Sequence, residues 1–324
     1  MQVARSLAEA SRLGGAGKPH AVTIGNFDGV HKGHRELIRV TREKAAARGG
    51  SSVLLTFDPH PVHVVRGVAS PGILTPLPRK LELLEQAGLD GVLVLPFTKD
   101  TAAMTAEEFV RAVLVEGLHA GDLVTGFNFA LGKGREGNYS TLCELGLRYH
   151  FDVAQVPPVI VGKETVSSSL IREHVRCGDM DKAAELLGRM HSVDGEIMHG
   201  QARGRKLGYP TANINFEKTL LPPLGAYATW LQVLPDETGG GTEPMMSMTS
   251  VGTNPTFGGG SVTLESHVFD FSGDLYGKRV RLYFVHRLRA EIRFQSIEDL
   301  VARLGQDATA AKAALERNRR KGLF

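Results

Sequence analysis

The chain carries the stretch TIGNFDGVHKGH at residues 23–34, where an apolar strand runs into a turn and then into two histidines, His31 and His34. A strand that turns sharply into a helix aims the free N–H groups of the helix start, and the positive end of its dipole, at one place. Such a place favours an anion, most often a phosphate. Both imidazoles can donate hydrogen bonds to phosphate oxygens and so stabilise charge in a transition state. We predict that these histidines hold a reacting phosphate, with Gly33 leaving room for its approach.

Apolar strands and amphipathic helices alternate through the first half of the chain. The predicted strands are, in chain order, HAVTIGNFD, SSVLLTFDP, GVLVLPF, DLVTGFNF and VAQVPPVIV. One of the helices between them, TAEEFVRAVLVEGL, begins with a capping box of Thr105 and Glu108. This alternation predicts an α/β fold in which a parallel sheet has helices on both faces. In such sheets ligands bind beyond the carboxyl ends of the strands.

The pattern changes in the second half. SSSLIREHVRCGDMDKAAELLGR predicts two short helices separated at Gly178–Asp179. Short strands then follow one another with Gly, Pro and Asp between them and no intervening helix, which predicts a small antiparallel β-barrel. A terminal helix is expected from about Ile297. We therefore predict two domains, at residues 1–188 and 189–324.

The composition is that of an ordinary globular protein, with 324 residues, 42% hydrophobic and 23% charged, and a net charge of +3. The length suggests about two domains. The charge is too small to indicate a nucleic-acid partner. No apolar run reaches the roughly 18 residues that cross a bilayer, and the first twenty residues lack the apolar segment of a secretion signal. We expect a cytoplasmic protein with no nucleic-acid or membrane partner, whose oligomeric state the sequence leaves open.

Several other motifs are incomplete. GGAGKP at 14–19 lacks the first glycine and the final Ser or Thr of a P-loop. The two cysteines, Cys143 and Cys177, are far apart, so neither a disulfide framework nor a cysteine zinc site is predicted. HPVH at 60–63 adds two histidines, but no spacing closes a tetrahedral zinc site. GKGREG at 132–137 follows no βαβ start, and we predict a flexible loop over the histidine site.

A second candidate site lies in HGQARGRKLGYPTANI at 199–214. PTAN supplies the Thr211 hydroxyl and the Asn213 amide, which are hard oxygen ligands that suit Mg²⁺. Glu265, in the predicted strand TLESHVFDF, can accept the proton of a substrate hydroxyl as a general base. Cations, a hard metal site and a base are the parts that phosphoryl transfer uses. The glycines and basic residues before PTAN predict a mobile, positively charged phosphate-binding loop that contains Gly200, Arg203, Gly204, Arg205, Lys206 and Gly208.

Both halves resemble one known family in the order and spacing of their motifs. GNFDGVHKGH resembles the HxGH signature of the nucleotidylyltransferases, and VSSSLIR at 166–172 resembles their second signature. With TFDPHP and GFNFALGKGREGN, the first half is similar to the FMN adenylyltransferase module of bifunctional riboflavin kinase/FAD synthetases. In the second half, GRKLGYPTANI, LPPLGAYA, SVGTNPTFGGG, LESHVFDFSGDLYGK and LRAEIRF resemble the riboflavin kinase family. The resemblance runs from about Ala21 to Leu304.

The resemblance implies a Rossmann-like nucleotidylyltransferase domain followed by a riboflavin kinase β-barrel. It implies that His31 and His34 stabilise the α-phosphate of ATP while the phosphate of FMN attacks it. In the barrel it implies that Thr211 and Asn213 hold Mg²⁺ with the phosphates of ATP, and that Glu265 activates the riboflavin 5′-hydroxyl. The nucleotide-binding and phosphate-binding residues that it implies in the first site are Gly25, Asn26, Phe27, Asp28, Gly33, Asn128, Ser167, Ser168 and Arg172.

Five residues depart from the family pattern. The chain has Ala130–Leu131 where a second aromatic is frequent, Ser169 where Thr is usual, Tyr209 where Phe is frequent, and Ala226 where Val is frequent. These departures leave the predicted chemistry intact and bear mainly on the contacts to flavin.

The expected reaction is synthesis of FAD from riboflavin through FMN, with ATP as co-substrate and Mg²⁺ in both steps. One alternative is a monofunctional riboflavin kinase whose adenylyltransferase domain is inactive or has another specificity. The complete HxGH and SSSxIR motifs weigh against it. The other alternative is a non-catalytic regulator that binds flavin or nucleotide. It needs no general base, so Glu265 with Thr211 and Asn213 weighs against it.

Overall fold

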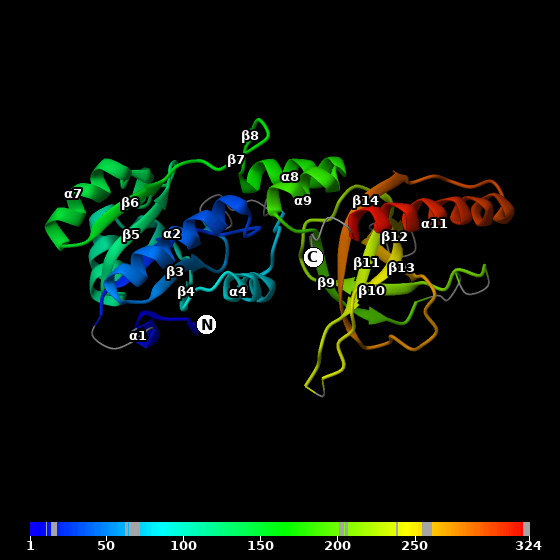
Figure 1. The fold of residues 1–324 in the computed structure, drawn as a ribbon, viewed down its shortest axis with the longest axis horizontal. Helices are drawn as coiled ribbons and strands as arrows, with labels where there is room; N and C mark the ends of the chain where they lie inside the picture. The colour runs from blue at the N-terminus through cyan, green and yellow to red at the C-terminus, as the bar shows by residue number, and fades with distance from the viewer. Residues whose placement is uncertain are drawn as a thin grey trace. The chain divides into compact units, whose positions relative to one another are not determined.

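The computed structural model of the chain describes residues 1–10, 12–13, 18–61, 64, 72–200, 204, 207–237, 239–254 and 261–319. They fall into two compact units, Met1–Ser167 and Ser168–Phe324 (Figure 1). Each unit is built around its own β-sheet and its own apolar core.

The first unit contains a six-stranded sheet in the order β1-β4-β3-β2-β5-β6, with every neighbouring pair parallel. This confirms the predicted α/β sheet. β1 was not predicted, because three residues are too short to show a periodicity. The predicted strand VAQVPPVIV is broken by its two prolines into β6 and β7, and β7 forms a small hairpin with β8. The strands are β1 (Gln2–Ala4), β2 (His20–Ile24), β3 (Ser52–Phe57), β4 (Gly91–Leu95), β5 (Ala120–Gly126), β6 (Asp152–Val156), β7 (Ile160–Val161) and β8 (Glu164–Thr165).

Helices bury both faces of this sheet. On β3, Val53 and Leu55 belong to one apolar cluster and Leu54 belongs to another, as the period of two in a strand requires. The predicted helix from Thr105 keeps its capping box but changes after one turn into a π-helix, η1. The helices of this unit are α1 (Leu7–Ala10), α2 (Lys32–Arg48), α4 (Leu77–Gln86), α5 (Lys99–Ala103), α6 (Ala106–Phe109), η1 (Val110–Gly117), the 3-10 helix η2 (Lys133–Arg135) and α7 (Tyr139–Tyr149).

The strand order reverses at β2. The chain passes from β2 through α2 to β3 on one side, whereas β5 pairs with β2 on the other side. In parallel sheets a ligand binds outside the carboxyl ends of the strands at such a reversal. The segments that leave the sheet there are residues 25–31, after β2, and residues 127–128, after β5. The fold therefore brings both predicted histidines to the position where a ligand is expected.

The second unit begins with two short helices and continues as a closed antiparallel barrel in the order β10-β13-β12-β11-β14-β9. Both features were predicted, as was the terminal helix. β10 was not singled out as a strand, because it follows the glycine-rich stretch directly. The elements are α8 (Ser168–Cys177), α9 (Met180–Leu187), β9 (His191–Met198), β10 (Ala212–Phe216), β11 (Gly225–Val233), β12 (Met245–Asn254), β13 (Ser261–Val268), β14 (Arg279–Ala290) and α11 (Ile297–Arg319).

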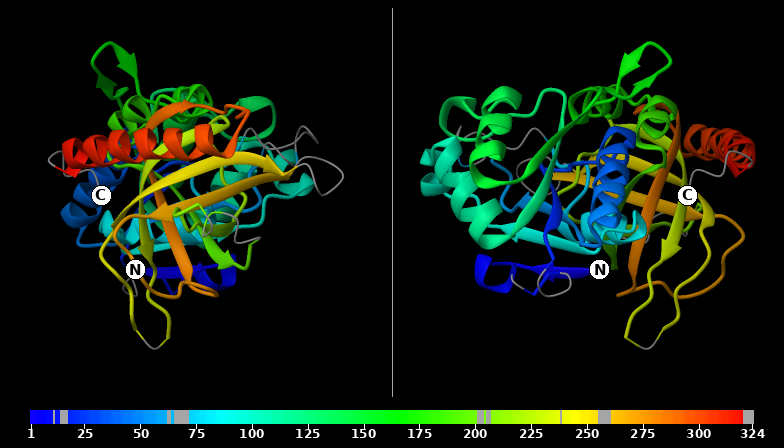
Figure 2. Two further views of the ribbon diagram at one scale, coloured as in Figure 1. Left: turned by 90° about the vertical axis from the view of Figure 1, so that its right-hand side faces the viewer. Right: turned by 60° about the vertical axis from the view of Figure 1, so that its left-hand side comes forward.

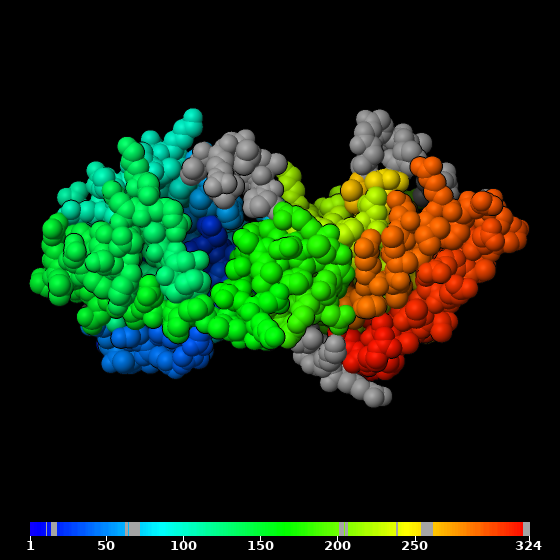
Figure 3. Space-filling view, turned by 90° about the horizontal axis from the view of Figure 1, so that it is seen from above, coloured from blue at the N-terminus to red at the C-terminus, as the bar shows by residue number. Residues whose placement is uncertain are grey.

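The terminal helix α11 covers the outer face of the barrel. It runs across the strands in the left view of Figure 2 and lies against β14 in Figure 3. Its Ala311 and Leu315 pack in one apolar cluster with Trp230 of β11. At the edge of this contact the buried Asp307 accepts hydrogen bonds from Arg289 (2.8 Å) and Arg303 (3.1 Å). Apolar packing and the hydrogen bond from Arg289 of β14 to Asp307 thus hold α11 on the barrel.

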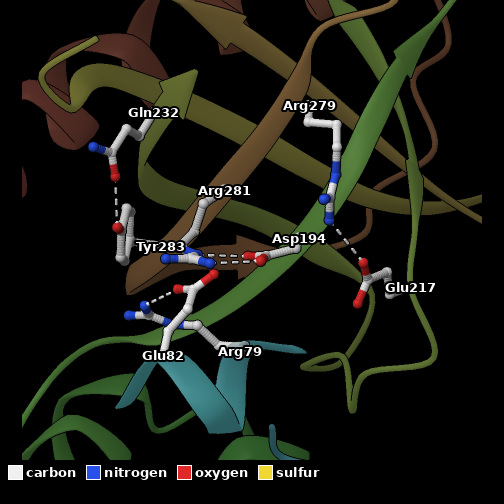
Figure 4. A network of polar contacts seen from close by, with 8 residues as sticks. All are labelled: Arg79, Glu82, Asp194, Glu217, Gln232, Arg279, Arg281 and Tyr283. Atoms are coloured by element: carbon white, nitrogen blue, oxygen red, sulfur yellow. Dashed lines mark hydrogen bonds and ion pairs between the residues drawn. The ribbon is translucent and has the colours of Figure 1, made fainter. Parts of the chain in front are cut away.

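Polar side chains also fix the β9–β14 pairing that closes the barrel. Arg281 lies directly opposite Asp194 and donates to both carboxylate oxygens, each at 2.7 Å (Figure 4). A bidentate pair of this kind adds geometric specificity to the register of the strands. Figure 4 also shows the Tyr283 hydroxyl donating to Gln232 at 2.7 Å, which links β14 to β11.

Candidate functional site

The turn between β2 and α2 has a strained backbone. Phe27, Gly29 and Val30 have positive φ angles of 48°, 92° and 39°. Glycine tolerates this conformation, but an aromatic and a β-branched residue adopt it rarely. Strain of this kind persists only where the surroundings impose it, and it concentrates at functional sites.

The two histidines form a stack with an aromatic ring from this turn. The rings of His31 and His34 lie 3.6 Å apart, and Phe27 stacks on His34 at 4.5 Å. His31 is the N-cap of α2, because its Nδ1 accepts the backbone N–H of His34 at 3.2 Å. Nδ1 is thus an acceptor, so the neutral ring of His31 carries its proton on Nε2. Nε2–H is therefore the hydrogen-bond donor of this ring.

Gly33 makes room for the ring of His31. A Cβ atom at this position would lie 3.2 Å from both Cε1 and Nδ1 of His31, and 3.7 Å from the carbonyl oxygen of Val166. The approach of a phosphate to Gly33 stays a prediction, and the structure adds this second reason for a glycine. The same contact shows that Val166, which precedes Ser167 in the chain, lies close to the first turn of α2.

Hydrogen bonds at Asn26 and Asp28 connect the turn to α4 and to the residues just before it. The buried Asp28 carboxylate accepts the N–H groups of Leu74 and Thr75 at 3.0–3.1 Å. The ammonium of Lys80 donates to the carbonyl oxygen of Asn26 at 2.8 Å. The roles of Asn26 and Asp28 toward phosphate stay predictions. Lys80 was not predicted as a site residue, because one lysine among the leucines of an amphipathic helix looks like a solvated position.

Asn128 lies at the carboxyl end of β5 and is exposed, next to an exposed Phe127. Its carbonyl oxygen accepts a hydrogen bond from Arg135 at 2.9 Å. The loop 132–137 was predicted to be flexible over the site, and this stays a prediction. Two hydrogen bonds connect it to the region around the start of α6: the N–H of Lys133 donates to the Met104 carbonyl and the N–H of Ala106 donates to Glu136, both at 2.8 Å.

The second predicted signature forms the start of α8. Ser168 is the first residue of the helix, and Ser167 precedes it as the last residue of the first unit. Arg172 lies one turn further along and is buried. Residues four apart share one face of a helix. The N-terminus of α8 therefore carries a hydroxyl and a guanidinium on one face, and their role toward phosphate stays a prediction.

The predicted metal ligands and base of the barrel lie together. Asn213 of β10 pairs with Glu265 of β13 in the strand register. The Thr211 hydroxyl donates to Oε2 of Glu265 at 3.3 Å. Gly200 packs so closely that a Cβ there would lie 1.9 Å from Nδ2 of Asn213. The chain thus needs a glycine at position 200, beside the predicted ligand Asn213. The other predicted residues of this stretch, Arg203, Arg205 and Lys206, lie outside the described residues.

This patch suits Mg²⁺ by its donor chemistry. It offers a hydroxyl, an amide oxygen and a carboxylate, all of them hard oxygen donors. In the described part of the chain, no group of three or more His, Cys, Asp or Glu side chains could hold a metal ion. Mg²⁺ commonly uses one or two protein oxygens and completes its shell with phosphates and water. The residues present therefore fit a metal that arrives with a nucleotide.

A pocket of about 280 Å³ opens beside the barrel patch, which consists of Thr211, Asn213 and Glu265. Thr211 and Ser266 contribute polar groups to its wall, and Phe271 and Tyr276 contribute aromatic rings. Tyr276 also stacks on His199 at 3.8 Å. Aromatic side chains beside a few polar groups are typical of small-molecule sites. This pocket was not predicted from the sequence, although its aromatic residues lie in the stretch FDFSGDLYG that follows β13.

Comparisons with known proteins place the two halves of the chain in two known families. The FAD synthetase family matches residues 16–170, and the Riboflavin kinase family matches residues 187–315. Relatives named "Bifunctional riboflavin kinase/FMN adenylyltransferase" include one from Escherichia coli (strain K12), 34% identical over 90% of this chain and 91% of the relative. Another, from Haemophilus influenzae, is 36% identical over 97% of this chain and 99% of the relative.

A solved structure also shares the fold of the whole chain. It is titled "Crystal Structure of Macrolide-efflux Protein from Streptococcus pneumoniae" and is 29% identical, with a TM-score of 0.85 over 96% of this chain and 99% of that one. That title names a different activity from the relatives above. Among the described residues, no helix combines the length and the apolar character needed to cross a membrane. With matches to both family descriptions and to relatives over nine-tenths of its length, the chain belongs to the family of bifunctional riboflavin kinase/FMN adenylyltransferases.

Proposed function

We propose that this chain makes FAD from riboflavin in two ATP-dependent steps. The barrel phosphorylates riboflavin to FMN, and the parallel-sheet domain transfers AMP from a second ATP to FMN with release of pyrophosphate. The observation that carries the proposal is a pair of polar side-chain clusters of different design, one in each half of the chain. One is a histidine stack at a helix start, and the other is a set of hard oxygen ligands with a carboxylate base.

In the barrel, Glu265 accepts the proton of the riboflavin 5′-hydroxyl. The hydroxyl oxygen then forms a bond to the γ-phosphorus of ATP as the bond to the β-phosphate oxygen breaks, and ADP leaves. Thr211 orients the carboxylate through its hydrogen bond, and with Asn213 it would hold Mg²⁺. When bound, Mg²⁺ supplies positive charge that offsets the charge on the transferring phosphoryl group. The aromatic pocket beside Thr211 is the proposed seat of the nucleotide base.

In the sheet domain, a phosphate oxygen of FMN attacks the α-phosphorus of ATP and displaces pyrophosphate. The attacking oxygen is already ionised, so this step needs no general base. His31 donates from Nε2 to the α-phosphate, His34 supports it through the ring stack, and the positive end of the α2 dipole adds to the stabilisation. Ser167, Ser168 and Arg172 are the proposed contacts to the outer phosphates.

We assign the adenylyltransferase to residues 1–188 and the riboflavin kinase to residues 189–324. Both reactions draw on ATP, and we place them in the cytoplasm. The test is incubation of the folded protein with riboflavin, ATP and Mg²⁺, followed by chromatography of the flavins. The proposal expects both FMN and FAD. Absence of both products from folded protein contradicts it, whereas FMN alone leaves a monofunctional riboflavin kinase.

A further inference from the structure

Lys80 lies in the middle of α4, and its ammonium contacts the turn between β2 and α2. The residue is 7% exposed, and Nζ donates to the carbonyl oxygen of Asn26 at 2.8 Å. The hydroxyl of Thr56 donates to the same carbonyl at 3.3 Å. Asn26 directly precedes Phe27, whose positive φ places its ring on His34. The contact of Lys80 is therefore one residue away from the ring stack that presents His31.

The surroundings of Lys80 are unusual for a cation. Apolar neighbours on α4, among them Leu77, Leu81 and Leu84, belong to the cluster packed against this face of the sheet. The charged groups that face the ammonium are Asp28, in the turn, and Asp58, just after β3. Burial lowers the pKa of Lys80, and these two carboxylates oppose that effect only in part. A leucine or methionine would bury this position at lower cost, so the charge needs a reason beyond packing.

We propose that Lys80 is a positioning residue for the adenylyl transfer, holding the Asn26 carbonyl so that Phe27, His34 and His31 keep their stacked geometry. It also adds fixed positive charge below the place where the α-phosphate binds. Preorganised charge of this kind acts on the transition state more than on the bound substrate. This inference rests on the function proposed for the sheet domain.

Kinetics of Lys80→Met test the proposal, with the barrel reaction of the same preparation as internal control. Conversion of FMN to FAD is expected to lose at least about tenfold in kcat, while KM for ATP changes less than about threefold. Conversion of riboflavin to FMN is expected to stay within about twofold of wild type. Lys99→Met, at an exposed position on α5, is the matched control and leaves both rates unchanged.

The pH profile separates positioning from a purely structural role. Only the charged form of Lys80 acts, so raising the pH removes the active form. The rate of FAD formation is therefore expected to fall on the alkaline side below the ordinary lysine pKa of about 10.4. Lys80→Met lacks this decline, and so does the kinase reaction of wild type.

The outcomes are distinguishable. If wild type forms FMN but no FAD, the function proposed for the sheet domain fails. If wild type forms FAD and Lys80→Met does so at an unchanged kcat, the positioning role is overturned. If Lys80→Met also loses the kinase reaction and its thermal transition, the same rates are measured on Lys80→Gln, whose amide keeps a donor without the charge. An unchanged kcat for FAD formation by Lys80→Gln then overturns the role. A wild-type profile with no alkaline decline specific to FAD formation also overturns the role.

Discussion

His31 does two things at once. Its Nδ1 caps α2, and its Nε2–H is the donor that we propose for the α-phosphate. The same division explains why Gly33 follows so closely, because any side chain there would press on the ring. Sequence alone indicated that the two histidines belong to a phosphate site. It could not indicate the stacking with Phe27, which depends on a backbone conformation that no local propensity favours.

His31→Ala is expected to lower the rate of FAD formation from FMN by about 100-fold or more, because one fixed donor to the reacting phosphate is lost. Formation of FMN from riboflavin should continue, so FMN accumulates. Loss of the helix cap costs about 1 kcal/mol, which a thermal melt detects and separates from unfolding. FAD synthesis at the wild-type rate would exclude His31 from the reaction.

Glu265→Gln is expected to reduce FMN formation by a factor of about 10² to 10⁴, because the amide cannot accept the hydroxyl proton. Supplied FMN should still be converted to FAD. Glu196→Gln, at an exposed position of the barrel strand β9, is the control and leaves both rates unchanged. Retention of kinase activity by Glu265→Gln would remove Glu265 from the role of base.

His20 is expected to make the folding stability of the protein fall at acid pH. It is buried at the start of β2, its Nδ1 has no hydrogen-bond partner among the described residues, and burial together with the charge of His119 lowers its pKa. The unfolded chain then binds more protons than the folded chain just below pH 6.5 or so, so stability falls as the pH drops through about 6.5. Denaturant titrations from pH 7.5 to 5 should show a smaller decline in His20→Gln. An equal decline in both proteins would contradict this.

At the scale of elements, strands with clear alternation and helices with caps were predictable, as β3 and the capping box at Thr105 show. Elements whose form depends on distant contacts were not. The three residues of β1 are a strand only because β4 lies beside them, and the loop 132–137 is hydrogen-bonded to the region around the start of α6. The residues of the barrel patch were predictable from the sequence. That Asn213 of β10 lies opposite Glu265 of β13 was not, because it depends on the register of two strands far apart in the chain.

The attachment of α11 to the barrel should depend on Asp307. Asp307→Asn weakens the bonds to Arg289 and Arg303 and leaves buried donors poorly satisfied. We expect the unfolding free energy of the barrel to fall by about 1–3 kcal/mol, measured by denaturant titration. Glu316→Gln, exposed on the same helix, is the control and should change it little. Equal stabilities of the two variants would show that apolar packing alone holds the helix.

At the scale of the whole molecule, the division of the chain places α8 and α9 with the barrel, and α9 packs on β14 and β9. The boundary that we propose from sequence, after residue 188, leaves α9 with the sheet domain. A fragment of residues 168–324 should therefore fold cooperatively and phosphorylate riboflavin. A fragment of residues 189–324 should have a lower melting temperature, because it exposes the surface that α9 buries. Calorimetry of the two fragments decides between the boundaries, and equal melting temperatures would favour the one after residue 188.

The claim that one chain holds two separate nucleotide sites is tested most directly by a time course with riboflavin, ATP and Mg²⁺. Wild type is expected to accumulate FMN first and FAD later, His31→Ala to stop at FMN, and Glu265→Gln to form FAD only from added FMN. Loss of both reactions in either folded variant would contradict the account, because it would mean that the two steps share one site.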